Sequence, residues 1–331
     1  MEDAPVDRTL SGRYGSVVWV ANCRAPEVLA STRYTAIIPA KELGGRVAVF
    51  YSPMNPDEFL DREDPSVLIL TKHFENSLLD LAKSASRRGI PIITNLCDWH
   101  FDNQERRPID HELCRLANVV MAPCETMCSA IWTQFGIEAR LIEEPVELPP
   151  DKARFQPSNP LRIFWCGHSS NLDTLGPGLE QLARVRCGGL QLHLMSNRPP
   201  PPWVVENQNW QSPITAKFTP FSLHGQIEGL RQCHLAIIPS LKTNDKLVKP
   251  PGRLVNIIRT GRFAVVHPLP SYVPLGDYCW CGEDIGEGVT FALGNPKECK
   301  DRLIRGQKFV EDNFSPRVVG EKIASLIDSL L

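Results

Sequence analysis

The stretch LAIIPSLKTNDKLVKPPGRLVNIIRTGRFAVVHP, residues 235–268, predicts the fold of the chain. It opens with a short apolar run at residues 235–238, which is typical of a buried parallel strand. A lysine-rich loop follows, and two prolines then favour a helix at about residues 251–260, because proline suits the first helical turn. Gly261 can end that helix, and residues 263–266 form a second apolar strand. This order indicates an α/β sheet, in which ligands bind at the carboxyl ends of the strands.

The loop between these two strands is rich in cations. Lys242, Lys246, Lys249 and Arg253 fall together at the end of a strand and the start of a helix. The free N–H groups of the first helical turn add positive potential at the same place. The loop therefore predicts a site for a phosphate or a diphosphate, the alternative being a solvated basic loop.

The helix after the loop resembles the donor-binding element of glycosyltransferases with the GT-B fold. In one bacterial branch this element reads lysine, two small residues, Asn-Arg, an apolar pair, a polar residue, then Gly-Arg or Gly-Lys and an apolar strand. The segment KPPGRLVNIIRTGRFAVVHPLPSY, residues 249–272, follows that order. The resemblance implies that Lys249 and Arg253 bind the donor diphosphate and that Asn256 binds the ribose. Asn256 replaces the glutamate of many members, and Gly252 replaces an asparagine, so the identity of the donor stays open.

The composition describes an ordinary globular protein of two domains. The chain has 331 residues, 42% of them hydrophobic and 22% charged, and a net charge of −2, which argues against nucleic acid as a partner. Its eleven cysteines are scattered singly, which predicts free thiols. A polar N-terminus and the lack of a long apolar run favour a cytoplasmic location. Peripheral contact with a membrane and the oligomeric state stay open.

Strands and helices alternate along the whole sequence, which predicts a mostly parallel sheet covered on both faces in each domain. The expected domains are residues 1–145 on the acceptor side, a proline-rich linker at 146–160, and a nucleotide-sugar-binding domain at 161–315. The terminal helix, 316–331, is expected to pack back on the first domain. The fold class is therefore α/β, with two doubly wound Rossmann-like domains separated by a cleft, as in GT-B enzymes. The expected strands are residues 16–21, 46–51, 66–70, 90–95, 119–122, 140–142, 162–166, 191–195, 235–238, 263–266 and 278–281.

A glycine-containing loop follows the first strand of the second domain. Gly167 would let a ligand approach the backbone, and the N–H groups and hydroxyls after it could bind phosphate oxygens. The resemblance implies that this loop faces the donor diphosphate; the alternative is an ordinary loop that caps a helix. The residues concerned are Gly167, His168, Ser169, Ser170 and Asn171.

Candidates for the acceptor side follow strands of the first domain. Asp98 and His100 come after the strand at residues 90–95, and His73 comes after the strand at 66–70. Asp or His can take the proton of an acceptor hydroxyl, which an inverting transferase requires. The alternative is that Asp98 orders a loop while His100 packs locally.

These features predict a glycosyltransferase that moves a sugar from a nucleoside-diphosphate sugar, linked to UDP or GDP, to a hydroxyl acceptor. Cations and helix N–H groups would stabilise the departing diphosphate, so neither a metal nor another cofactor is expected. Two alternatives stay open: a GT-B sugar-nucleotide epimerase and a non-catalytic protein that binds nucleotide sugars.

Overall fold

The computed structural model describes residues 12–72, 75–206 and 208–331, and these form two compact units. Unit 1 comprises the described residues up to Glu147 together with Val248–Pro250 and Phe314–Leu331. Unit 2 comprises the described residues of Leu148–Leu247 and Pro251–Asn313. Residues 248–250, expected in the second domain, thus belong to unit 1.

Unit 1 is built on a sheet whose strands, in the described part of the chain, lie in the order β2-β1-β3-β4-β5-β6. Every pair of neighbouring strands described in it is parallel. The strands are β1 (Val17–Ala21), β2 (Arg46–Val49), β3 (Val67–Leu70), β4 (Ile92–Asn95), β5 (Val119–Ala122) and β6 (Ala139–Leu141). The first helical segment consists of α1 (Ala30–Thr32), a π-helical turn η2 (Arg33–Ile37) and α2 (Ile38–Leu43), which follow one another without a break. The other helices are α3 (Pro56–Glu63), α4 (Ser77–Arg87), α5 (Arg106–Leu116), α6 (Glu125–Phe135) and α14 (Pro316–Asp328).

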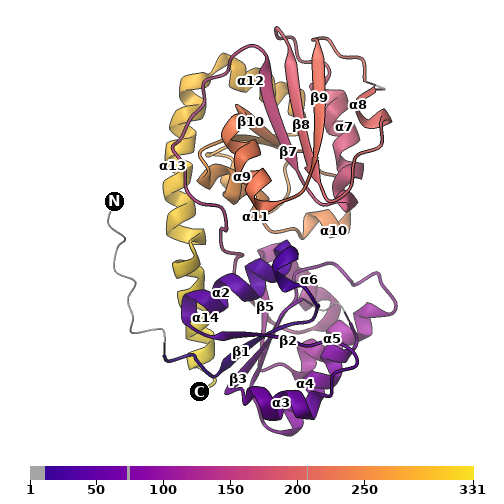
Figure 1. Cartoon of the computed structure of the whole chain (residues 1–331), viewed down its shortest axis with the longest axis vertical. Helices are drawn as coiled ribbons and strands as arrows, with labels where there is room; N and C mark the ends of the chain where they lie inside the picture. The colour runs from indigo at the N-terminus through magenta and orange to yellow at the C-terminus, as the bar shows by residue number, and fades with distance from the viewer. Residues whose placement is uncertain (1–11, 73–74, 207) are drawn as a thin grey trace. The chain divides into compact units, whose positions relative to one another are not determined.

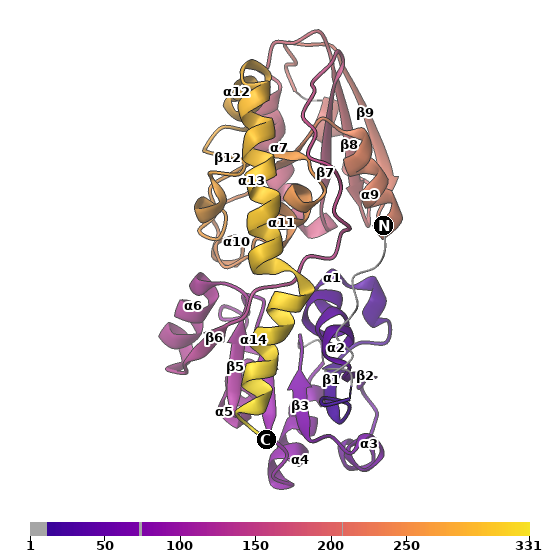
Figure 2. The ribbon, with the colours of Figure 1, turned by 90° about the vertical axis from the view of Figure 1, so that its left-hand side faces the viewer.

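Both faces of this sheet are covered because its central strands are apolar on both sides. On one face α2 and α14 pack together, and Val319, Ile323 and Ile327 of α14 enter the same core as Val17 and Trp19 of β1. Figures 1 and 2 both show α14 beside α2. The other face buries apolar side chains of α3, α4 and α5 against β1 and β3. A helix from the end of the chain therefore completes the core of unit 1.

Unit 2 repeats this plan with the strand order β12-β11-β10-β7-β8-β9 in its described residues, again with parallel neighbours. One face packs on α7, α12 and α13, which share an apolar core with the strands. The strands are β7 (Leu161–Cys166), β8 (Leu190–Ser196), β9 (Ile214–Pro220), β10 (Leu235–Ile238), β11 (Phe263–Val266) and β12 (Trp280–Cys281). The helices are α7 (Leu172–Leu182), α8 (Trp203–Glu206), α9 (Leu223–Gln232), α10 (Asn244–Leu247), α11 (Gly252–Arg259), α12 (Ile285–Gly294) and α13 (Pro296–Phe314). The 3₁₀ turns of this unit are η3 (Ser169–Asn171) and η4 (Val273–Leu275), while η1 (Pro26–Val28) lies in unit 1.

The opposite face of the unit 2 sheet packs on α9. Gly229 of α9 lies against the ring of Phe164, and a Cβ atom at residue 229 would come within 2.5 Å of that ring. The glycine therefore allows the helix to approach β7 closely. Beyond this contact, β9 at the edge of the sheet has no fully buried residue.

The predicted fold class, α/β with two parallel sheets, is confirmed, and α11 occupies most of the expected helix at 251–260. Strand β9 and helices α3, α5, α10 and α12 were not predicted. All eleven cysteines are free thiols, as expected. Within the described residues, no helix is both long and apolar enough to cross a membrane.

The return of α14 to unit 1 predicts a large effect of a substitution near the end of the chain. Ile327 is fully buried against the sheet, so Ile327→Ala should lower the free energy of unfolding by about 2–5 kcal/mol. Leu331 is 66% exposed, so Leu331→Ala should change it by less than about 0.5 kcal/mol. Urea unfolding followed by circular dichroism measures both, and equal midpoints for the two variants would contradict the docking of α14.

Candidate functional site

The carboxyl ends of the strands of unit 1 carry a cluster of charged side chains. Lys72 follows β3, Asp98 follows β4 and Glu144 follows β6. One oxygen of Asp98 lies 2.5 Å from Nζ of Lys72, and the other lies 2.6 Å from Nζ of Lys249. Lys249 reaches this cluster because residues 248–250 belong to unit 1, where Cys124 Sγ donates to the carbonyl oxygen of Val248 at 3.0 Å.

The two lysines fix the charge of Asp98. Burial alone would raise the pKa of its carboxyl group, but Lys249 and Lys72 outweigh burial and hold that pKa well below its usual range. Asp98 is therefore ionised at neutral pH and is a weak proton acceptor. Its main effect is to hold two ammonium groups at one edge of the sheet.

Glu144 has the opposite character. Burial raises the pKa of Glu144 to about 7; Lys249 and Lys72 oppose this rise, and Asp98 adds to it. A carboxyl group with this pKa gains and loses a proton near neutral pH, as general acid–base catalysis requires. Sequence analysis missed Glu144, although its place directly after the last strand of unit 1 was a signal that could have identified it.

His100 has partners of its own. Its Nδ1 lies 2.8 Å from an oxygen of Asp110, which is 2% exposed, and its Nε2 lies 3.3 Å from Nη1 of Arg106. Asp98 and His100 are two residues apart but bind different groups, so they do not form one acid–base pair. His73 lies outside the described residues, and its role stays a prediction.

The predicted glycine loop of unit 2 forms a compact turn after β7. Ser169 donates its N–H to Oδ1 of Asn197 at 2.7 Å, and Ser170 donates its N–H to Nδ1 of His168 at 3.2 Å. Lys246 of α10 donates from Nζ to Oδ1 of Asn171 at 2.9 Å, and its side chain is only 8% exposed. The structure therefore brings Lys246, rather than Lys249, to this loop.

Arg253, the second residue of α11, lies beside the same loop. Its Nη1 atom is buried and has no hydrogen-bond partner among the described residues. A Cβ atom at Gly167 would lie 3.4 Å from this Nη1 and 2.9 Å from the ring of Trp165. Glycine therefore allows the ring of Trp165 and this unpaired donor to lie close to the backbone, and a buried donor of this kind needs an acceptor. An anionic oxygen that reached Nη1 would satisfy it.

Asn256 ties α11 to the start of unit 2. Its Oδ1 accepts a hydrogen bond from the N–H of Leu148 at 2.9 Å, and its Nδ2 donates to the carbonyl oxygen of Gly252 at 2.8 Å. The residue is 1% exposed. Its amide binds backbone in this structure, and contact with a ribose stays a prediction.

The raised pKa of Glu144 predicts a dependence of stability on pH. The folded state holds the proton more tightly than the unfolded chain, whose pKa is near 4.5. This contribution to stability is therefore complete below pH 4.5 and is lost as pH rises through 7. Glutamine keeps the neutral form, so Glu144→Gln should exceed the wild type by less than about 1 kcal/mol at pH 5 and by up to about 3 kcal/mol at pH 8.

Urea unfolding at the two pH values tests this expectation. Glu143→Gln is the matched control, because Glu143 is paired with Lys322 at 2.6 Å and its replacement should bring no gain at pH 8. If Glu144→Gln and the wild type differ in their free energy of unfolding by the same amount at pH 5 and pH 8, the raised pKa of Glu144 is refuted.

Comparison of structures supports the fold, whereas comparison of sequences finds no match. No protein-family model matches the chain, and no curated protein matches its sequence. The structure of Anabaena HepE in complex with UDP-glucose superposes with a TM-score of 0.73 at 12% identity, over 95% of this chain and 99% of that one. A glycosyltransferase from Rickettsia africae superposes with a TM-score of 0.62 at 10% identity, over 96% of this chain and 99% of that one. The structure of trehalose-6-phosphate from E. coli bound with UDP-2-fluoro glucose superposes with a TM-score of 0.62 at 12% identity, over 95% of this chain and 99% of that one. The chain therefore has the GT-B fold of these glycosyltransferases, as its sequence predicted.

Proposed function

We propose that the protein is a glycosyltransferase that moves a sugar from a nucleoside-diphosphate sugar to a hydroxyl acceptor. The observation that carries this proposal is the buried, unpaired Nη1 atom of Arg253 beside Gly167, at the carboxyl end of β7. Solved proteins with this fold bind UDP or UDP-glucose, which supports a nucleotide sugar as the ligand.

The donor half of the reaction uses the cations of unit 2. Arg253 and Lys246 would bind the diphosphate and stabilise its charge as the sugar leaves. The N–H groups of Gly167, Ser169, Ser170 and Asn171, predicted to bind it, donate to acceptors within the protein instead. Lys249 is ion-paired with Asp98, so we expect a smaller contribution from it. With these groups in place, we propose that transfer from a UDP- or GDP-linked sugar needs no metal and no further cofactor.

The acceptor half of the reaction needs a group that takes a proton. Glu144 suits this role better than Asp98, because its pKa lies near neutrality while that of Asp98 is held low by two lysines. We therefore assign proton transfer to Glu144 and the positioning of the lysines to Asp98. His100, oriented by Asp110, is the second candidate for the base.

The location and partners follow from the same proposal. We propose a cytoplasmic enzyme that acts on a nucleotide sugar and a hydroxyl-bearing acceptor and binds no nucleic acid, in keeping with its net charge of −2.

Loss of a donor cation should weaken nucleotide binding. Arg253→Ala and Lys246→Ala should each reduce the affinity for UDP or GDP about ten- to a hundredfold, because each removes one charge-assisted hydrogen bond. Titration calorimetry measures the affinities. Lys308→Ala is the control, because Lys308 is 80% exposed and pairs with Asp312 across one helical turn. Unchanged affinity for UDP and GDP in both Arg253→Ala and Lys246→Ala would contradict the proposed donor site.

Loss of the base should lower turnover without affecting donor binding. Glu144→Gln should slow the release of UDP from UDP-glucose, with water as the acceptor, by about a hundredfold or more. Asp98→Asn and His100→Ala, assayed in parallel, rank the other candidates, and Glu143→Gln serves as the control. Full turnover in Glu144→Gln would overturn its role. Formation of an epimeric sugar nucleotide, detected by NMR, would favour an epimerase instead.

A further inference from the structure

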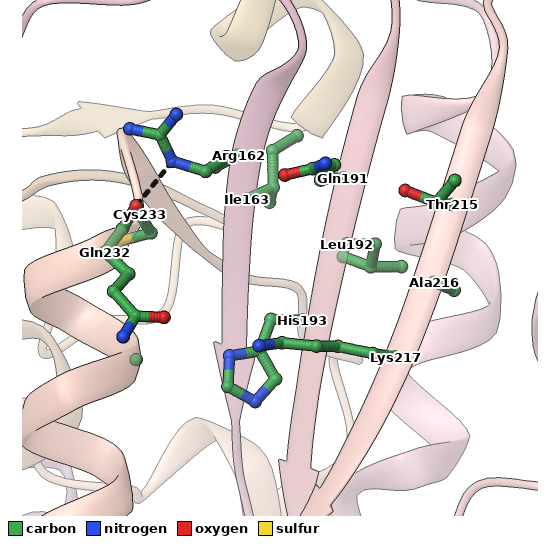
Figure 3. Close-up of a pocket in the computed structure, with 11 residues that line it drawn as sticks. Arg162, Ile163, Gln191, Leu192, His193, Thr215, Ala216, Lys217, Gln232 and Cys233 are labelled. Carbon is green, nitrogen blue, oxygen red and sulfur yellow. Dashed lines mark hydrogen bonds between the residues drawn. The ribbon is translucent and has the colours of Figure 1, made fainter.

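A hollow with both polar and apolar lining residues lies on the face of the unit 2 sheet that carries α9. It has a volume of about 290 Å³ and is lined by side chains of β7, β8, β9 and the end of α9 (Figure 3). Because α9 packs on Phe164 of β7 through Gly229, it leaves β8 and β9 partly open on this face. The doubly wound plan would cover this region with a helix, so its composition calls for an explanation.

The strand register sorts the lining residues into two rows. Arg162, Gln191 and Thr215 lie opposite one another on β7, β8 and β9. Two residues further along, Phe164 of β7 and Lys217 of β9 lie on either side of His193 of β8. Figure 3 shows Lys217 reaching across β8 toward the imidazole of His193. Each row thus has a cation at one end, and the residues between the two rows, Ile163, Leu192 and Ala216, are apolar.

No carboxylate side chain lines this hollow, and Arg162 and Lys217 have no ion-pair partner among the residues that the structure describes. Arg162 uses Nε to bind the carbonyl oxygen of Gln232 at 2.6 Å, which leaves the ends of its guanidinium for other acceptors. Burial, and then Lys217, lower the pKa of His193 to about 4, so its imidazole is neutral at pH 7. The positive charge here is therefore not balanced by the protein.

A solvated sheet face would explain polar side chains but not this pattern of charge. Neighbouring strands gain stability from opposite charges placed across from each other, and lose it from like charges. Here a lysine lies directly opposite a histidine whose protonation it opposes. A lysine on an edge strand can discourage pairing with other chains, which accounts for Lys217 alone. It does not account for Arg162 or for the hollow between them.

We propose that this hollow binds the phosphate group of a small phosphorylated sugar or of free phosphate, with Lys217 as the cationic contact. Arg162, two strands away and directed toward the end of α9, adds positive charge at the other end of the hollow. The side-chain amides of Gln191 and Gln232 and the hydroxyl of Thr215 suit the hydroxyl groups of a sugar. Arg162 lies five residues before Gly167, about 16 Å along an extended chain. The site is therefore separate from the donor loop of unit 2.

Titration calorimetry on the full chain tests the site with ribose 5-phosphate, inorganic phosphate and ribose as probes. Lys217→Gln removes the charge of an exposed residue and should weaken binding of the phosphorylated probes about tenfold or more. Lys297→Gln, an exposed lysine of α13 in the same unit, is the matched control and should bind like the wild type. Arg253→Ala removes the cation of the donor loop and should leave this binding intact.

The outcomes distinguish the site and the source of the phosphate. Binding of either phosphorylated probe that is lost in Lys217→Gln and kept in Arg253→Ala supports the proposal. A preference for ribose 5-phosphate over inorganic phosphate identifies a sugar phosphate as the source. Binding that is lost in Arg253→Ala and kept in Lys217→Gln places the anion in the donor loop and overturns the proposal. The proposal is also overturned if neither ribose 5-phosphate nor inorganic phosphate binds, or if ribose binds as tightly as ribose 5-phosphate.

Discussion

Parallel sheets must be covered on both faces, and this requirement organises both units. Their central strands are apolar on each side, so an uncovered face would leave a large apolar surface in water. In unit 1 the covering helix α14 comes from the far end of the chain. In unit 2 the rule is relaxed where β8 and β9 run beyond α9, and there the residues on the open face are polar instead.

The parallel order of the strands also brings reactive side chains together. All carboxyl ends of such strands lie at one edge, so residues that are far apart in sequence, such as Lys72, Asp98 and Glu144, form one charged cluster. The two carboxyl groups of this cluster have different environments. Two lysines keep Asp98 ionised, whereas burial raises the pKa of Glu144 toward neutrality. The same edge of unit 2 brings Gly167, Lys246 and Arg253 together. Each unit thus presents reactive groups where the topology ends its strands.

Local sequence pattern predicted the fold well, because apolar runs and their Gly and Pro boundaries are local signals. It predicted the strand and helix around Arg253 and the loop at Gly167 for the same reason. It missed β9 and α5, because Lys217 and Thr215 on the one, and Arg107 and Asp110 on the other, dilute the apolar pattern. It also missed the ion pair of Lys249 with Asp98 and the buried state of Glu144. Both depend on long-range packing, and no local pattern carries that information.

The division of unit 1 into separate pieces has a consequence for how the protein is made. The strands of its sheet emerge from the ribosome first, but α14, which covers one of their faces, is translated only after residues 148–315. At ordinary elongation rates this delay is roughly ten to thirty seconds. During that time the apolar face of unit 1 next to α2 stays open to water. Helix α13, which completes the core of unit 2, is made directly before α14. Both units therefore gain their last covering helix only at the end of translation, and a chaperone would be most useful before that point.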